Sequence, residues 1–279
     1  MHVVGYLRGD LALAGDEPFE ARPAVGSRFR LAGAKFWADG SIQGLSAALR
    51  VPYTCRPDHR GELLYDEDTL RTICGKAAAS GAQVAVHANG DAAVEATVRV
   101  LGPLQRPGAA PHRIEHCQVA SPADHDAIRE AGLGVSFFVN HVHYWGDRHR
   151  RLFLGPDRAP DIDALAWADA RGQRFGLHSD CPITPMDPLR TIWSAVARRT
   201  REGEVLGAHQ RLDVHRALRA MTADSAWLAG EEDVAGSLVQ GKRADLVAVD
   251  VDLAAADEDA LRRARAVAVM VDGQWAVQP

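Results

Sequence analysis

The sequence predicts an α/β fold in which strands and helices alternate around a parallel sheet. Short apolar runs, each followed by a helical pattern, recur along most of the chain, and glycine, proline or aspartate residues separate them. Such alternation is typical of parallel strands joined by right-handed crossovers. The expected strands lie near residues 30–36, 83–87, 113–116, 135–139 and 174–178, with a candidate sixth at 2–7. A closed (β/α)8 barrel has eight strands, so a barrel of this kind would lack its N-terminal part.

The first quarter of the chain contains one clear strand and two irregular segments. Glycine, proline and acidic residues in 9–28 predict a loop. The apolar run Phe29–Trp37 predicts a strand that carries Lys35 near its end. Glycines and prolines interrupt every periodicity in 42–66, which indicates a long loop of the kind that often covers a functional site.

Helix-start signals mark the segments between the strands. Asp66 precedes a helix with an acidic first turn, which Gly81 ends. Ser121-Pro-Ala-Asp124 places a proline and an acid in the first turn of another helix. Residues 144–160 are expected to form an irregular, basic loop. Further helices are expected at 92–101, 161–171, 189–201 and 213–228.

The tail of the chain has a different character. Segments 236–250 and 266–277 read as short strands, and Asp272-Gly273 marks a hairpin turn. The chain is therefore divided into a partial barrel at 1–232 and a portion of a small β domain at 233–279.

Bulk composition excludes several classes of protein. The 279 residues are 47% hydrophobic and 25% charged, with a formal net charge of −5, so neither a nucleic acid nor an acidic membrane is an expected partner. No apolar run of about 18 residues and no signal peptide is visible, which favours a cytoplasmic protein. The four cysteines lie far apart without a CxxC pair and are expected to be reduced thiols.

Two histidines occupy equivalent positions at the ends of successive strands. His87 ends one predicted strand, and His116 ends the next. Either one taken singly is more often a structural histidine than a ligand. Adjacent parallel strands lie about 4.8 Å apart, however, so two strand-end imidazoles can reach one metal ion.

Asp180 and Lys35 are further candidates. Asp180 follows the last predicted strand, where a carboxylate can bind a metal and take a proton from water whose pKa the metal lowers; a loop cap is the alternative. Lys35 lies in an apolar strand, where a bare ammonium is costly to bury. Its head group either reaches the strand end, pairs with Asp39, or is carbamylated and becomes an anionic metal ligand.

Other candidates are weaker. His141-x-His143 has metal-ligand spacing for one strand face, but its aromatic setting at a strand-to-loop junction favours substrate contact or loop packing. Cys117 and Cys181 are interpreted as small packing residues beside proposed ligands. The sequence contains no glycine-rich phosphate loop and no GxSxG nucleophile elbow.

Five motifs in order resemble the amidohydrolase superfamily, and specifically its amidohydrolase-3 branch, which includes the N-substituted formamide deformylases. The resemblance covers nearly the whole chain. The motifs are Lys35-Phe-Trp-Ala-Asp-Gly-Ser41, Val86-His-Ala-Asn-Gly-Asp-Ala-Ala93, Arg113-Ile-Glu-His-Cys-Gln118, His178-Ser-Asp-Cys-Pro182 and Gly236-Ser-Leu-Val-Gln-Gly-Lys-Arg-Ala-Asp-Leu246.

The resemblance implies a (β/α)8 TIM-type barrel, incomplete at the N-terminus, with a small C-terminal β appendage. It further implies a metal-dependent hydrolase of non-peptide carbon–nitrogen bonds, with one or two divalent ions (zinc is expected) and a small amide or formamide as substrate. The implied metal ligands are carbamylated Lys35, His87, His116 and Asp180.

The resemblance also implies catalytic roles. Asp180 would be the general base, and His116 or His178 would polarise the carbonyl. Residues 137–144 would line the substrate pocket. The loop-ordering or supporting residues would be Asp39, Asn89 and Asp91.

One departure from the superfamily pattern leaves rival interpretations open. The HxH pair of the first barrel strand is absent, so the chain resembles the C-terminal portion of such an enzyme. The alternatives are a catalytically incompetent truncation that retains a partial metal site, and a non-hydrolytic binding protein with structural histidines. Exposed barrel edges would favour a homo-oligomer.

Overall fold

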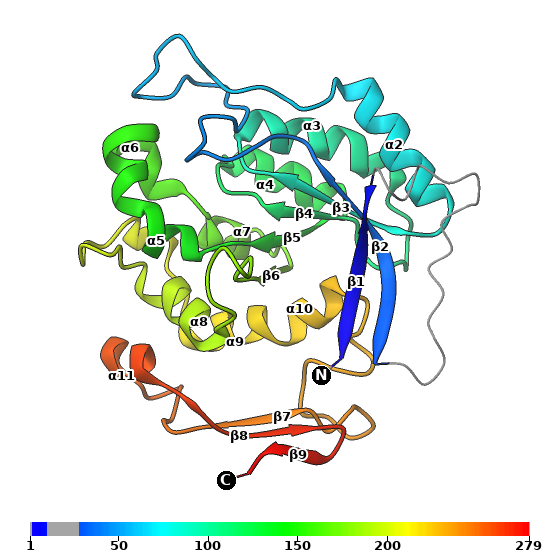
Figure 1. The fold of residues 1–279 in the computed structure, drawn as a ribbon, viewed down its shortest axis with the longest axis vertical. Coiled ribbons are helices and arrows are strands. Elements are labelled where there is room, and N and C mark those ends of the chain that lie inside the picture. Colours follow the sequence, from blue (N-terminus) through cyan, green and yellow to red (C-terminus); the bar gives the residue numbers. More distant parts are fainter. Residues whose placement is uncertain (1, 10–27, 279) are drawn as a thin grey trace.

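The computed structural model describes residues 2–9 and 28–278 and contains two separate sheets (Figure 1). The larger sheet has the order β1-β2-β3-β4-β5-β6, and every neighbouring pair in it is parallel. Its strands are β1 (Val3–Arg8), β2 (Phe29–Trp37), β3 (Gln83–Ala88), β4 (Arg113–His116), β5 (Gly134–Phe137) and β6 (Phe175–Leu177). This confirms the parallel α/β fold, including the candidate sixth strand at the N-terminus.

The sheet is open as far as the described strands show. β1 and β6 each pair with one neighbour, so no pairing closes a barrel among residues 2–9 and 28–278. Figure 1 shows a strong twist: β1 and β2 run nearly at right angles to β3–β6 in projection, and α2, α3 and α4 lie together above the sheet. The predicted loop 9–28 falls almost entirely outside the described residues.

Helices fill the crossovers from β2 to β6, and three more lie between β6 and the smaller sheet. They are α2 (Glu67–Ala79), α3 (Asp91–Leu101), α4 (Pro122–Glu130), α5 (Asn140–Arg148), α6 (Gly155–Arg158), α7 (Leu165–Ala170), α8 (Pro188–Ala197), α9 (Val214–Met221) and α10 (Ala223–Leu228). Short 3-10 or π-helical turns are η1 (Gly102–Leu104), η2 (His149–Phe153), η3 (Ala159–Asp161) and η4 (Ala208–Gln210).

Side chains at the first turns explain where several helices begin. The Asp66 carboxylate accepts a hydrogen bond from the Thr69 N–H at the start of α2. Ser121 and Asp124 form a reciprocal capping box at the start of α4, as the sequence pattern indicated. Each bond satisfies an amide that has no partner inside its helix.

The smaller sheet is antiparallel, with the order β7-β8-β9, and lies beside the start of β1 (Figure 1). Its strands are β7 (Leu246–Val249), β8 (Ala266–Val271) and β9 (Gln274–Val277), and α11 (Glu258–Arg263) precedes β8. The hairpin turn at Asp272-Gly273 is confirmed, since both residues have positive φ. The prediction of strand over 236–245 was wrong; this segment contains no strand.

Two expectations about the middle of the chain were also wrong. Residues 144–160 are mostly helical, because α5, η2 and α6 follow one another there. The single helix expected at 213–228 is two helices, since the backbone of Thr222 (φ −116°, ψ −86°) departs from helical geometry between α9 and α10. None of the described helices has the length and apolar character required to cross a membrane.

Candidate metal centre

The side chains that the sequence singled out lie at the carboxyl ends of the strands of the larger sheet. Lys35 belongs to β2, His87 to β3 and His116 to β4, while His178 and Asp180 follow β6. Strand register pairs Lys35 with Ala85 and His87 with Glu115, so these residues share one face of the sheet. Parallel strands bring such ends to a single edge.

His87 is oriented by the loops around it. Its Nε2 lies 2.9 Å from the carbonyl oxygen of Gly40, and Asn89 Nδ2 is 3.0 Å from the same nitrogen. If Nε2–H donates to Gly40, the lone pair lies on Nδ1, as is usual for a metal-ligating histidine whose other nitrogen is held by a carbonyl. Burial lowers the pKa of His87 to about 4, so the imidazole is neutral at pH 7.

His116 is the centre of a histidine cluster. Its backbone is in the left-handed region (φ 73°), so its side chain escapes the regular alternation of β4. Its ring centroid lies 4.5 Å from that of His87, 5.1 Å from that of His178 and 6.1 Å from that of His141. Burial, reinforced by the neighbouring histidines, holds the pKa of His116 well below its usual range.

Besides His141, two histidines of this cluster have a buried ring nitrogen without a partner. These nitrogens are His116 Nδ1 and His178 Nε2. Burial also lowers the pKa of His178 to about 3. Neutral imidazoles with unused nitrogens are the form in which histidine binds a divalent metal, so the donor set fits such an ion.

Asp180 and Lys35 affect each other's charge. Burial raises the pKa of Asp180, and the positive charge of Lys35 partly opposes this. Burial lowers the pKa of Lys35. The positive charge of Arg113 lowers it further, whereas the negative charges of Glu115 and Asp180 raise it. Asp180 also has a left-handed backbone (φ 50°), and its carbonyl accepts a hydrogen bond of 2.7 Å from the Ile183 N–H.

Sequence reasoning missed the ion pair between Arg113 and Glu115. Arg113 Nε lies 2.6 Å from Glu115 Oε1 on the face that also carries Lys35 and His87. Burial favours the neutral acid, but the charges of Arg113 and Lys35 prevail and lower the pKa of Glu115 to about 2. The period-two alternation of β4 was the signal that could have placed both residues on the site face.

Asp39 connects the two loops that flank His87. Its carboxylate accepts hydrogen bonds from the backbone N–H groups of Ala48 (2.9 Å), Asn89 (3.0 Å) and Gly90 (2.8 Å). Burial nevertheless raises the pKa of Asp39 to about 7. The loop that contains Ala48 is thereby held against the start of α3, beside the histidine cluster.

The spacing of His141 and His143 suggested that they share one face of a strand, but they do not. Both lie in α5, where residues two apart point in nearly opposite directions. His141 lies in the histidine cluster, and its Nδ1 is 3.6 Å from Oδ1 of buried Asp163. His143 Nδ1 instead contacts the carbonyl of Arg199 at 3.0 Å. Asp163 has no local sequence signal and was missed.

The predicted ligands do not converge on one point as ready-made metal cages do. Among the described His, Cys, Asp and Glu side chains, three ligand atoms within 4.8 Å of one another occur at His2, Asp245 and Asp272, and not at His87, His116 and Asp180. A single ion shared by those last three residues stays a prediction.

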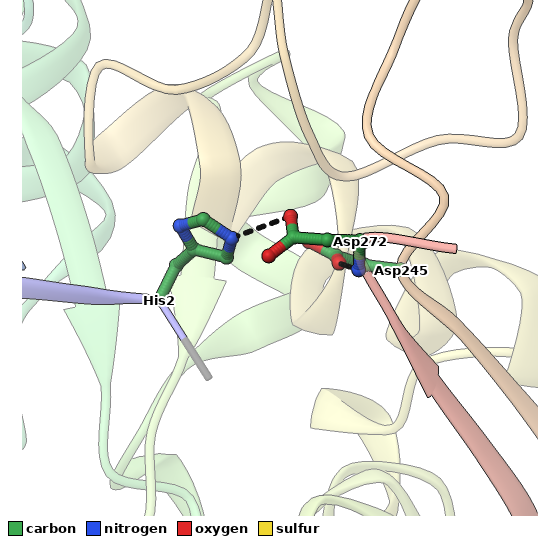
Figure 2. Close-up of side chains that lie close together, drawn as sticks. All are labelled: His2, Asp245 and Asp272. Carbon is green, nitrogen blue, oxygen red and sulfur yellow. Dashed lines mark hydrogen bonds and ion pairs between the residues drawn. The ribbon is translucent and has the colours of Figure 1, made fainter. Parts of the chain in front are cut away.

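The His2–Asp245–Asp272 cluster is better explained as a polar contact between β1 and the smaller sheet (Figure 2). His2 Nε2 lies 2.7 Å from Asp272 Oδ1, and the Asp272 N–H donates to Asp245. Arg28 lies 2.9 Å from the Asp272 carboxylate, and Arg243 lies 3.0 Å from that of Asp245. Each carboxylate is therefore already paired with an arginine side chain.

Comparison with known proteins relates the whole chain to metal-dependent hydrolases. A family model described as "Amidohydrolase family" matches residues 10–277. The putative amidohydrolase YtcJ of Bacillus subtilis (strain 168) is 30% identical over 250 residues, which cover 86% of this chain and 46% of that protein. N-substituted formamide deformylase of Arthrobacter pascens is 28% identical over 225 residues, covering 77% of this chain and 40% of that protein.

A solved structure agrees with the sequence relatives. An uncharacterized metal-dependent hydrolase from Pyrococcus horikoshii OT3 superposes with a TM-score of 0.82 at 27% identity, covering 93% of this chain and 52% of that chain. The chain thus spans about half the length of the proteins it matches.

Proposed function

The chain belongs to the amidohydrolase family, and on that premise we propose that it hydrolyses a carbon–nitrogen bond of a small non-peptide amide or formamide with a divalent metal, zinc being the expected ion. The observation that carries the proposal is the cluster of neutral imidazoles at the strand ends, centred on His116. The fold that we propose for the larger sheet is part of a (β/α)8 barrel, because its strands are all parallel and ordered sequentially.

The proposed ligands are Lys35, His87, His116 and Asp180. The imidazoles offer lone pairs without first losing a proton, because burial keeps them neutral. The lowered pKa of Lys35 increases the fraction of free amine, which can attack carbon dioxide and release a proton to give an anionic carbamate. The charge of Arg113, which disfavours the ammonium form, would favour that anion.

A bound divalent ion supplies Lewis acidity, which polarises a carbonyl and lowers the pKa of water. Asp180 serves as the proton carrier: it takes the proton of the attacking water and delivers it to the leaving nitrogen. Its raised pKa suits this role, because a base works best when its pKa approaches the working pH. His116 or His178 orients the substrate carbonyl.

Metal content and turnover test the proposal together. Purified protein is analysed for bound metal and assayed with N-substituted formamides and simple amides, alongside His116→Ala. The matched control is His209→Ala, since His209 is exposed and pairs with Asp161 at 2.6 Å, away from the cluster. We expect His116→Ala to lose metal affinity by tenfold or more and the control to keep it.

The outcomes separate the rival functions. A wild-type protein without bound metal, even after incubation with zinc, would overturn the proposal. Bound metal without turnover of any amide would favour the alternative, a metal-binding protein that is catalytically inactive.

We also propose that the isolated chain self-associates through the edges of the larger sheet. Among the described strands, β1 and β6 each have one paired neighbour, and unpaired strand edges present N–H and carbonyl groups to other chains. Sedimentation velocity over a range of concentrations is the measurement. A single monomeric species at high concentration, with cooperative unfolding, would contradict self-association.

A further inference from the structure

Behind the histidine cluster lies a buried acid that the proposed chemistry does not use. Asp163 has no exposed surface, and both of its carboxylate oxygens lack a hydrogen-bond partner. Oδ1 lies 3.6 Å from Nδ1 of His141, and that nitrogen also has no partner. A distance of 3.6 Å is too long for a hydrogen bond, although a shift of about 0.6 Å would form one.

His141 is held between aromatic rings and the metal-site histidines. Its ring centroid is 4.3 Å from Phe138, 5.7 Å from Trp145 and 6.1 Å from His116. Only 4% of the residue is exposed. The ring therefore has little freedom to rotate away from Asp163, and its remaining contacts are apolar faces or other imidazoles.

The backbone of Asp163 is fixed on both sides. Its N–H donates to the Gln118 carbonyl at 2.9 Å, and its carbonyl accepts from the Leu165 N–H at 2.8 Å. Its φ of 47° is unusual for a residue with a side chain. The backbone of Asp163 is thus fixed, and its completely buried side chain lies beside His141.

Arg198 fastens the same loop from the opposite side. This completely buried residue, also in the left-handed region (φ 48°), donates to the carbonyls of Asp163 (3.0 Å) and Ile162 (2.7 Å). Its Nε donates to the Leu206 carbonyl at 2.8 Å. Arg198 therefore supplies positive charge near Asp163, while its donor groups bond to carbonyls and leave the carboxylate available.

Backbone strain is concentrated around this arrangement. Seven described residues other than glycine have positive φ, and five of them are in or beside the site: His116, Cys117, Asp163, Asp180 and Arg198. Strained backbone persists where the surrounding structure enforces it and is frequent at functional sites. Asp163 and Arg198 thus share a left-handed backbone with two proposed metal ligands, His116 and Asp180.

We propose that Asp163 is a positioning residue for His141: its carboxylate accepts the Nδ1–H of the imidazole and so leaves the lone pair on Nε2, on the ring edge away from Asp163. Burial without a hydrogen-bond partner raises the pKa of the Asp163 carboxyl well above its usual range, although the charge of Arg198 opposes this. Accepting the Nδ1–H is the contact that favours the carboxylate form and satisfies both groups. Carboxylate–histidine pairs fix tautomers in this way in other sites.

The fixed tautomer has a consequence for substrate recognition, which rests on the proposed function. An imidazole with its lone pair on Nε2 is an acceptor and not a donor. If residues 137–144 line the substrate pocket, as the family resemblance implies, His141 accepts a hydrogen bond from the N–H of a bound secondary amide. A tertiary amide, which has no N–H, leaves that acceptor unsatisfied, so secondary amides are the preferred class.

Nitrogen NMR reads the tautomer directly and without reference to activity. Full-length protein labelled with 15N-histidine is recorded at pH 8, and the His141 signals are assigned by their disappearance in His141→Gln. We expect one tautomer, with the proton on Nδ1. A wild-type His141 protonated on Nε2 would overturn the inference, whatever the catalytic result.

Variants then test whether Asp163 is the cause. Asp163→Gly removes the carboxylate at a position whose positive φ glycine tolerates. We expect it to mix the tautomers of His141, while the matched control Asp161→Asn, which removes the anionic partner of exposed His209, leaves them unchanged. An unchanged His141 signal in a folded Asp163→Gly protein would contradict the assignment; should that variant not fold, Asp163→Asn, which also tolerates this backbone, takes its place.

Activity provides the second readout. With matched N-methyl and N,N-dimethyl amides, the wild type should prefer the secondary amide, and Asp163→Gly should reduce that preference about tenfold through KM. If the tautomer is as expected but no amide is turned over, the proposed function fails while the Asp163–His141 pair stands. If both amides react equally in the wild type, the recognition role of His141 fails.

Discussion

The tripeptide Val-Ala-Val occurs in β3 of the larger sheet and in both β7 and β8 of the smaller sheet, and in β3 and β7 it meets two different environments. In β3 it is Val84–Val86, where all three residues are completely buried. In β7 it is Val247–Val249, where Val247 is 62% exposed and Ala248 is also exposed. The local sequence is identical, so the difference comes entirely from what packs against each strand.

The two sheets are consequently stabilised by different kinds of contact. Helices α2 and α3 pack on β3, and the opposite face of the larger sheet carries the buried charges of Lys35, Arg113 and Glu115. The smaller sheet keeps one residue of β8, Ala268, in the core, whereas every residue of β9 is exposed. Perturbations should therefore be costly in the larger sheet and mild in the smaller one.

The largest effect is expected for Glu115→Gln. This change leaves the Arg113 guanidinium buried without its anionic partner, and breaking a buried pair in this way costs about 3–5 kcal/mol. Urea denaturation measures the loss. The matched control is Glu202→Gln, which breaks an exposed pair with Arg151 and should leave the midpoint unchanged.

The same pair predicts a pH dependence. The folded-state pKa of Glu115 is lowered to about 2 from its ordinary 4.5, so its contribution is fully present above pH 4.5 and is lost as the pH falls through 2. Glu115→Gln should remove this part of the acid sensitivity. Identical acid-unfolding curves for the wild type and Glu115→Gln would show that the Arg113–Glu115 ion pair does not contribute to the stability of the larger sheet.

A smaller loss is expected for Val86→Ala. Two methyl groups are removed from a completely buried site, which costs about 2–3 kcal/mol through lost transfer energy and a residual cavity. The measurement is again the unfolding free energy, with the slope of the transition checked for constancy. A change below about 0.5 kcal/mol would mean that β3 is not packed as tightly as its burial indicates.

Helix caps compare the two regions through losses of stability of about 1 kcal/mol. Ser121→Ala removes the capping box of α4, whose Ile128 is buried in the main core, and should lower the global stability by about 1 kcal/mol. Asp257→Ala removes the corresponding cap of α11, the short helix that leads into β8 and packs on α8 through buried Leu261. We expect it to increase hydrogen exchange in α11 and β8 and to shift the global transition less than Ser121→Ala does. Equal shifts in both variants would show that the two regions unfold as one.

The burial contrast also explains what the sequence could and could not predict. The strands of the larger sheet were found because apolar runs are bounded by glycine and proline, and the strand-end histidines followed from that placement. α5 was missed because Asn140-His-Val-His-Tyr-Trp145 has weak helix propensity, and packing of its rings against Phe138 and Trp193 decides its conformation.

Buried polar residues were the other class that local patterns could not reveal. Asp163 and Arg198 lie in loops, and their partners are carbonyls and an imidazole from distant segments. Glu115 was next to a recognised histidine, yet its partner and its burial depend on the register between β3 and β4. The alternation of β4 could have placed Glu115 on the site face, but which residues meet there is set by the tertiary structure.

The smallest effect is expected for Val247→Ala, the counterpart of Val86→Ala. Val247 is largely exposed and lines a groove with Leu238 and Trp275, so its truncation should change the free energy of unfolding by less than about 0.5 kcal/mol. The measurement is repeated at low and high protein concentration. A loss above about 1 kcal/mol that grows with concentration would mean that another copy of the chain covers this groove. A loss independent of concentration would mean that the smaller sheet contributes to the cooperative core, and the contrast between Val84–Val86 and Val247–Val249 would fail.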